Sequence, residues 1–244
     1  MTLETLQSII IPLLGDNVIG IIVFGSASCL DDFSPLSDVN VAIITREKVS
    51  LEERVVIAEE LGSDVSTVIL TGDELKKLLE DGEFLAHELI GDGKLVYANE
   101  SLYELITSKP PITSRTLEYL EKNALACLNL SLENYFSGRF HDSLNYAYKS
   151  LRSIVRYIGA KENKLCFRDK EVLSMLDQHG LVEAAEIYKK LRAGRFRGLK
   201  KGELFEILIK TYTTVLGLLG YKNVVPEKLV SFIEKNYAYV SRIK

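Results

Sequence analysis

The pattern of apolar residues changes once along this chain of 244 residues, at the pair Pro110-Pro111. Before this pair, short β-branched apolar runs alternate with segments of helical spacing, as expected for strands and helices that share one sheet. After the pair, the spacing is helical throughout. Because two consecutive prolines block the propagation of a helix, we place a domain boundary there. The sequence therefore predicts two domains, residues 1–110 and residues 111–244.

The first half predicts a small sheet with a few helices around it. The run from Val18 to Phe24 is almost continuously apolar, which is typical of a strand that is buried on both faces. Asp73 is a candidate cap for the helix that follows the third strand. The predicted strands are 18–24, 39–44, 65–70 and a short edge strand at 94–97. The predicted helices are 3–14, 52–61 and one that runs from 74 toward 90.

The second half predicts only helices, separated by glycines that suit helix ends. Short connections between helices favour antiparallel neighbours. The predicted helices are 115–136, 140–158, 169–178, 181–193, 202–219 and 227–239. The predicted fold class is therefore an α+β domain with a small mixed sheet, followed by an all-α up-and-down helical bundle.

Charge is divided unevenly between the two halves. The formal net charge of the chain is −4. Residues 1–112 carry 7 basic and 20 acidic side chains, and residues 113–244 carry 23 basic and 14 acidic side chains, so the halves have net charges of −13 and +9. A division of this size indicates two units with different partners, or two faces that attract each other.

The composition and the lack of a recognisable membrane span or secretory signal predict a cytoplasmic protein. Apolar residues make up 47% of the chain and charged residues 26%, which is ordinary for a globular fold. No apolar run is long enough to span a membrane, and the acidic start does not suit a secretory signal. The three cysteines, Cys29, Cys127 and Cys166, lack the paired spacing of a zinc site and are odd in number, so we expect reduced thiols.

One stretch between the first two predicted strands has the residues of a phosphate and metal site. Gly25-Ser26 follows the first strand directly, and Ser37-Asp38 leads into the second strand, in which Asn40 is the second residue. Glycine lets the backbone approach a phosphate closely, and the amides and hydroxyl of the next residues can donate to its oxygens. Residues 38 and 40 point to the same side because side chains alternate along a strand.

This stretch resembles the Gly-Ser…Asp-x-Asp signature of the DNA polymerase beta nucleotidyltransferase superfamily, especially its minimal prokaryotic members. The resemblance implies that Gly25, Ser26 and Ser37 bind a nucleoside triphosphate. It also implies that Asp38 and Asn40 occupy the catalytic positions, with Asp38 as a ligand of Mg²⁺. In the alternative interpretation, Gly25-Ser26 only connects a strand to a turn, and Asp38 caps a turn.

The chain departs from the family at the carboxylates. Asn40 stands where the second aspartate is expected, and Ser66 where a neighbouring strand supplies the third acid. Leu30 replaces a glycine that minimal members often carry. Only Asp38 keeps a negative charge at a position of the signature, so a second metal ion is poorly held. Substitute carboxylates in the adjoining loops are Asp31, Asp32 and Asp64.

The helical half resembles the HEPN domains that often accompany minimal nucleotidyltransferases. The resemblance covers about residues 114–220 and rests on the stretch from Asn134 to Gly159, with its turn followed by Asp142-Ser143 and Ala147-Tyr148. Catalytic HEPN domains carry an arginine followed four to six residues later by a histidine. The corresponding segment here, 192–198, has no histidine, which speaks against nuclease chemistry.

A dense basic cluster lies at the turn between two helices of this half. Such a density suits a nucleotide tail or an RNA backbone, although a solvated face or a surface that docks on the acidic domain would look the same. The candidate residues for binding phosphate or RNA are Lys189, Lys190, Arg192, Arg195, Arg197, Lys200 and Lys201.

Two hypotheses for function follow. The first is nucleotidyl transfer from a nucleoside triphosphate to a hydroxyl acceptor by a degenerate metal site, with a small-molecule acceptor suggested by a resemblance to aminoglycoside-modifying members of the superfamily. The second is a catalytically inactive protein that binds a nucleotide, RNA or another protein. Under either hypothesis we expect a homodimer and no membrane partner.

Overall fold

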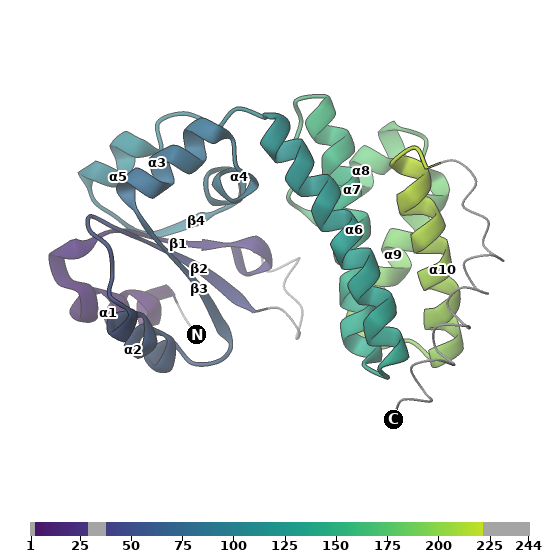
Figure 1. Ribbon diagram of the computed structural model, residues 1–244, viewed down its shortest axis with the longest axis horizontal. Coiled ribbons are helices and arrows are strands. Elements are labelled where there is room, and N and C mark those ends of the chain that lie inside the picture. Colours follow the sequence, from purple (N-terminus) through teal and green to yellow (C-terminus); the bar gives the residue numbers. More distant parts are fainter. Residues whose placement is uncertain (1–2, 29–37, 222–244) are drawn as a thin grey trace. The chain divides into compact units, whose positions relative to one another are not determined.

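The computed structural model describes residues 3–28 and 38–221, and the chain divides into two compact units, residues 1–116 and 117–244 (Figure 1). The first unit holds a sheet with helices on both faces. The second unit is entirely helical over its described residues. An α+β unit followed by a helical bundle is the fold class that the sequence predicts, and the structure confirms it. The position of a domain boundary at residue 110 stays a prediction.

Over residues 3–28 and 38–116, the sheet of the first unit has four strands of mixed direction. The order across the sheet is β3-β2-β1-β4, with β1 antiparallel to both of its neighbours and β2 parallel to β3. All residues of β1 are buried, as the apolar run predicts for a central strand. The strands are β1 (Val18–Phe24), β2 (Val39–Thr45), β3 (Val65–Thr71) and β4 (Lys94–Ala98).

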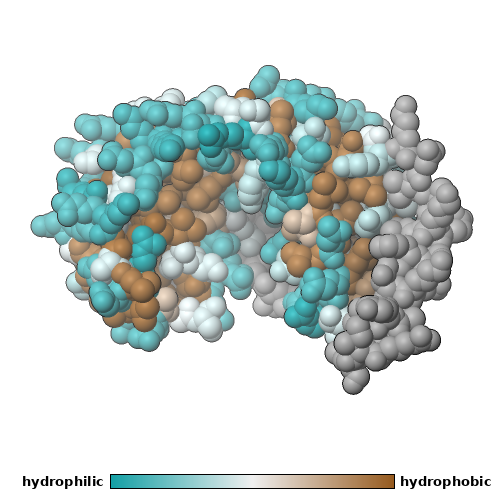
Figure 2. All heavy atoms as spheres, viewed as in Figure 1, coloured by the Kyte–Doolittle hydropathy of each residue, from teal (hydrophilic) through white to brown (hydrophobic). Residues whose placement is uncertain are grey.

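Helices cover each face of this sheet (Figure 1). Alternate residues of β2 separate the two apolar cores, since Val41 and Ile43 belong to one and Ala42 and Ile44 to the other. The first core is closed by α1 (Leu3–Leu14) and α2 (Leu51–Leu61). The second is closed by α3 (Gly72–Asp81), α4 (Phe84–Gly91) and α5 (Glu100–Leu105). Hydrophilic side chains cover much of the outer side of these helices (Figure 2).

The single helix predicted from 74 toward 90 is wrong, as is its cap. The chain forms two helices, because Gly82 adopts a left-handed conformation (φ 65°) and ends α3. The N-cap of α3 is Thr71. Its hydroxyl oxygen accepts a hydrogen bond from the Glu74 amide, and the Glu74 carboxylate accepts one from the Thr71 amide. The short helix α5, capped by Asn99, was not predicted from the sequence.

The second unit packs five described helices around one core. Its helices are α6 (Ser114–Phe136), α7 (Phe140–Lys161), α8 (Asp169–Gln178), α9 (Val182–Arg197) and α10 (Lys201–Leu218). Each of them contributes buried apolar side chains to that core, in which Tyr148 and Tyr188 are the largest. The predicted helix at 227–239 lies outside the described residues. No helix in the described ranges is both long enough and apolar enough to cross a membrane.

Candidate functional site

A tight turn follows β1 at the position where the sequence predicts phosphate binding. Residues Gly25–Ser28 form a single 3₁₀ turn, η2, directly after the last residue of the strand. Gly25 has φ +68°, and a Cβ atom there would lie 3.2 Å from the Asn40 side-chain nitrogen. The hydroxyl of Ser28 donates to the Gly25 carbonyl oxygen at 2.5 Å and holds the turn closed. A side chain at position 25 would therefore meet both backbone strain and the Asn40 amide.

The start of β2 lies beside this turn. Phe24 is paired with Asn40 across β1 and β2, so Gly25 emerges next to Asn40. Asp38 immediately precedes the strand and is exposed. In the parallel pairing of β2 with β3, Asn40 is the direct partner of Ser66. The register thus places the amide and the hydroxyl side by side, at the two positions where the family resemblance expects carboxylates.

Asp92 is a buried acid near this turn that sequence reasoning missed. It follows α4, it is 8% exposed, and its carboxylate accepts the Ser28 hydroxyl at 3.2 Å. Ser28 therefore connects Asp92 to the backbone of Gly25. No spacing rule links residues 28 and 92, which are brought together only by the packing of α4 against β1.

The described residues at this edge of the sheet do not fit a pair of metal ions. Asp38 provides one carboxylate, Asn40 an amide and Ser66 a hydroxyl, whereas two Mg²⁺ ions together need several carboxylate ligands. Across residues 3–28 and 38–221, no group of three or more His, Cys, Asp or Glu side chains is placed to hold a metal. Asp64 immediately precedes β3, and its carbonyl oxygen accepts a hydrogen bond from the Val39 amide. Ser37, Asp31 and Asp32 lie outside the described residues.

The predicted basic cluster is divided by the fold. Arg195 is 6% exposed, and its guanidinium carbon lies 4.3 Å from the centroid of the Tyr148 ring. Arg192 is half-buried and donates to the Asp169 carboxylate at 2.5 Å. These two arginines are therefore structural members of the bundle. The exposed members of the cluster are Lys189, Lys190, Arg197, Lys200 and Lys201.

Asp169 is the centre of a buried polar network that the sequence did not reveal. One of its carboxylate oxygens accepts hydrogen bonds from both the Tyr148 and the Tyr188 hydroxyl groups, and the other accepts from Arg192. Arg152, also on α7, lies over the Tyr148 ring, with its guanidinium carbon 5.9 Å from the ring centroid. Helices α7, α8 and α9 are thus tied together through one carboxylate that is 3% exposed.

This network sets the ionisation of its members. Burial would raise the pKa of the Asp169 carboxyl, but the tyrosine hydrogen bonds and the neighbouring arginines outweigh burial, and its pKa lies below the ordinary value. Burial raises the pKa of Tyr188 well above the usual range, and the charge of Asp169 raises it further. The tyrosines therefore stay neutral donors to an ionised carboxylate.

Comparison with known proteins agrees with the motif and the fold. Residues 7–102 match the family described as Polymerase beta, Nucleotidyltransferase. No curated protein matches the chain. The solved structures that are similar include spectinomycin adenyltransferase AAD(9) from Enterococcus faecialis, determined with ATP and spectinomycin. It is 11% identical, with a TM-score of 0.62 and coverage of 89% of this chain and 98% of that chain.

A nucleotidyltransferase-like protein from Exiguobacterium sibiricum 255-15 is 14% identical over 89% of this chain and 78% of that chain, with a TM-score of 0.30. The likeness to the adenyltransferase concerns the fold, because the identity is low. The family match covers the sheet, the η2 turn and Asp38. Residues 7–102 therefore form a nucleotidyltransferase domain of the polymerase beta type.

Proposed function

We propose that this protein binds a nucleoside triphosphate at the η2 turn and the start of β2, and transfers its nucleotidyl group to a hydroxyl acceptor. One observation carries the proposal. The left-handed Gly25 turn lies beside the strand that Asp38 opens, within a domain of the polymerase beta type. A turn of this kind would offer backbone amides to the phosphate oxygens.

The roles of individual residues follow from the chemistry of nucleotidyl transfer. The acceptor hydroxyl gives up its proton to solvent as its oxygen forms a bond to the α-phosphorus, and the bond from the α-phosphorus to the oxygen of the leaving pyrophosphate breaks. Backbone amides at Gly25 and Ser26, with the hydroxyl groups of Ser26 and Ser37, would hold the phosphate oxygens. Asp38 would hold a Mg²⁺ ion that arrives with the triphosphate, and such an ion neutralises phosphate charge when bound. We expect slow turnover because Asn40 and Ser66 supply no further carboxylate.

The first experiment is a thermal shift measurement with each nucleoside triphosphate, in Mg²⁺ and again in chelator, on wild type and Asp38→Ala. A site of the proposed kind gives Mg²⁺-dependent stabilisation that the variant loses. Asp73→Ala is the matched control, since Asp73 is an exposed acid in α3, beyond the opposite end of β3. Equal stabilisation of wild type and Asp38→Ala would refute the assignment of the site.

Transfer itself needs a separate readout. ATP labelled at the α-phosphate, incubated with candidate hydroxyl compounds, would give a labelled product and free pyrophosphate. Spectinomycin is the first acceptor to test, because the structural neighbour was determined with ATP and spectinomycin. Nucleotide binding without any labelled product would leave the binding site in place and would argue against the transferase reaction with the compounds tested.

A second candidate function is that of a catalytically inactive nucleotide-, RNA- or protein-binding module. It is favoured by the side-by-side placement of Asn40 and Ser66, where catalysis expects acids. In this case the exposed basic residues of the helical unit would bind an RNA backbone. Affinity for a short RNA would fall steeply with salt, and Arg197→Gln combined with Lys200→Gln would reduce both affinity and the salt slope. Salt-insensitive binding, or no binding, would contradict the RNA-binding form of this candidate.

Three further expectations belong with this proposal. The helical unit would be HEPN-like, on the strength of the stretch from Asn134 to Gly159. The protein would be a homodimer in solution and would be located in the cytoplasm. Sedimentation of the purified protein across a concentration series tests the homodimer, and fractionation of the source cells tests the location.

A further inference from the structure

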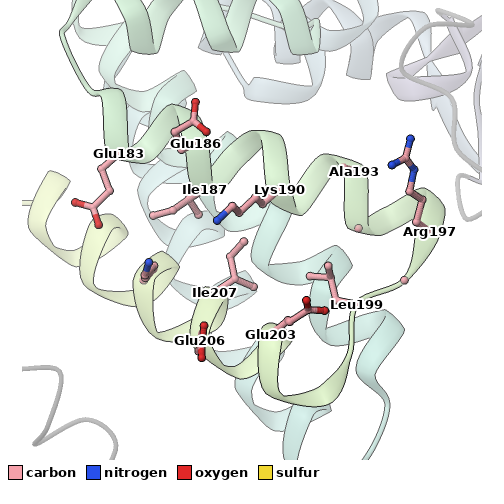
Figure 3. Close-up of a pocket in the computed structure, with 13 residues that line it drawn as sticks. Glu183, Glu186, Ile187, Lys190, Ala193, Arg197, Leu199, Glu203, Glu206 and Ile207 are labelled. Atoms are coloured by element: carbon pink, nitrogen blue, oxygen red, sulfur yellow. The ribbon is translucent and has the colours of Figure 1, made fainter.

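The two units differ in how they could receive an anionic group. In the second unit, an open groove of about 490 Å³ lies between α9 and α10 (Figure 3). Among the described residues, four glutamates line this groove together with three bases, and both helices contribute charges of each sign. A phosphate there would be repelled by at least as many charges as attract it. The start of β2 in the first unit has a different composition, and it carries a further inference.

Two neutral side chains accompany Asp38 at this edge of the sheet. Asn40 follows Asp38 by two residues, and Ser66 is the direct partner of Asn40 on β3. Both lie on the face of the sheet that also carries Ala42 and Val68, because side chains alternate along a strand. Carboxylates at positions 38, 40 and 66 would carry three negative charges, whereas the residues present carry one. The difference equals the charge of one divalent cation.

Asn40 and Ser66 are also hydrogen-bond donors, which an ionised carboxylate is not. The Asn40 amide nitrogen carries two N–H groups and the Ser66 hydroxyl carries one O–H, whereas a carboxylate only accepts. Asn40 is half-buried and Ser66 is exposed. Within residues 3–28 and 38–221, neither side chain makes a hydrogen bond to another residue. Both donors are therefore available to an anionic oxygen that reaches this edge.

The Asn40 amide lies against the turn that a phosphate would contact. Its nitrogen is 3.2 Å from the position that a Cβ atom on Gly25 would take, so the missing side chain of Gly25 leaves the space beside this amide open. No hydrogen bond within the described residues fixes the rotation of the amide, and its N–H groups can turn toward oxygen atoms bound at the η2 turn. Asn40 and the backbone of η2 are thus close enough to contact one phosphate group.

We propose that Asn40 and Ser66 donate hydrogen bonds directly to phosphate oxygens of the nucleotide, and that the site therefore binds a phosphate chain without requiring a divalent cation. Hydrogen bonds to a charged acceptor are stronger than those between neutral groups, which suits donors at this position. Asp38 can still hold one Mg²⁺, which adds to the affinity. The inference rests on the proposed nucleotide site and specifies how that site holds its phosphates.

Calorimetric titration of the full-length protein with ATP, once in Mg²⁺ and once in chelator, tests the proposal. Wild type should bind ATP under both conditions, and inorganic pyrophosphate should compete in chelator. Asn40→Ala should bind ATP in chelator about tenfold to a hundredfold more weakly, the loss expected for hydrogen bonds to a charged group. Asn40→Asp should lose at least as much affinity in chelator, because its carboxylate repels phosphate. It should recover in Mg²⁺, since a cation can then lie between the two anions.

Controls separate this effect from misfolding and from added charge. Recovery of Asn40→Asp in Mg²⁺ shows that the variant is folded, and the melting temperature without nucleotide gives the same check for Asn40→Ala. Ser8→Asp adds an acid to α1, which covers the other face of the sheet, and should leave the affinity for ATP within about twofold of wild type.

Each remaining outcome contradicts a different statement. ATP binding by wild type that requires Mg²⁺ overturns this inference and leaves the proposed nucleotide site in place. Binding by Asn40→Asp in chelator that is as tight as that of wild type overturns it too, because position 40 would then not contact phosphate. No binding of ATP under either condition overturns both this inference and the proposed function.

Discussion

At the scale of single residues, a few positions tolerate substitution poorly because of their backbone conformation or their burial. Gly25, Asp169 and His87 each have surroundings that a substitution would disturb in a different way. Gly25 has positive φ and the Asn40 side-chain amide beside it. Asp169 accepts hydrogen bonds from two tyrosines and an arginine. His87 is buried and contacts Thr116 in the first turn of α6. Each therefore gives a prediction that depends on one side chain.

Gly25→Ala should weaken nucleotide binding and cost stability. The left-handed conformation costs a non-glycine residue about 1–2 kcal/mol, and the new methyl group would also press on the Asn40 amide. The matched control is Gly15→Ala. Gly15 also has positive φ (+53°), but a Cβ atom added there would have no neighbouring atom within 4 Å. Thermal shifts with ATP should fall for Gly25→Ala only. A loss of binding in both variants would point to a general effect of strain.

Asp169→Asn should destabilise the helical unit by about 3–5 kcal/mol. The variant loses the negative charge that pairs with Arg192. Its new amide nitrogen also replaces one acceptor oxygen, either the one that serves the two tyrosine hydroxyl groups or the one that serves Arg192. Urea denaturation followed by circular dichroism measures the change. Asp177→Asn, an exposed position on the same helix, is the control and should change stability by less than about 0.5 kcal/mol.

His87 should make the first unit less stable in mild acid. Burial lowers the pKa of His87, although hydrogen bonds with the backbone of Pro111 and Gly82 offset part of this effect. The unfolded chain therefore binds the proton more readily than the folded chain. The free energy of unfolding should fall as pH drops below about 6.5, by at most about 1.4 kcal/mol per pH unit from this group. It should not change from this group at higher pH.

Denaturation at a series of pH values, for wild type and His87→Gln, isolates that contribution. The variant should have a flatter profile between pH 5 and 7, about the range in which a histidine titrates. His141→Gln, at an exposed position, should keep the wild-type profile. A wild-type slope that survives in His87→Gln would assign the effect to other groups.

At the scale of secondary-structure elements, the register of β2 and β3 determines what the candidate site contains. Asn40 pairs with Ser66, so the two side chains are neighbours on the face covered by α3, α4 and α5. The sheet therefore brings positions 40 and 66 side by side, and neither position carries an acid.

Asn40→Asp with Ser66→Asp should create a Mg²⁺-responsive protein. Two carboxylates on directly paired residues repel each other, and we expect a loss of up to about 1 kcal/mol without metal. Mg²⁺ should restore that loss in the double variant and should leave wild type unchanged. Calorimetric titration with Mg²⁺ and melting with and without chelator measure both effects. A double variant as indifferent to Mg²⁺ as wild type would mean that the side chains do not converge.

Most of the elements could be predicted from the sequence, since the strands have continuous apolar runs and the helices have regular spacing. The helix pair α3 and α4 could not, because the left-handed Gly82 interrupts an apolar pattern that would also fit one longer helix. The turn at Gly25 and the substitution at Ser66 were visible in the sequence. Asp92 and Asp169 were not, because their partners are distant along the chain and only tertiary packing brings them together.

At the scale of the whole molecule, the chain combines a polymerase beta-type domain over residues 7–102 with a helical unit that buries its own core. The basic cluster shows why composition alone overestimates a binding surface. Two of its seven predicted residues, Arg192 and Arg195, are used to hold helices together. The remaining exposed lysines and Arg197 are those that a test of RNA binding should address.

The outer edge of β3 has a consequence for the behaviour of the protein at high concentration. Among the strands that the structure describes, β3 lies at an edge of the sheet, and its seven residues include neither a charged residue nor a proline. Natural edge strands usually carry such residues to discourage pairing with a second sheet. Thr67→Lys should therefore raise the solubility limit and reduce light scattering in concentrated samples, whereas Ser8→Lys on α1 should not. The stability of concentrated samples in storage and crystallisation should accordingly depend on solution components that cover the unpaired backbone amides and carbonyls of β3.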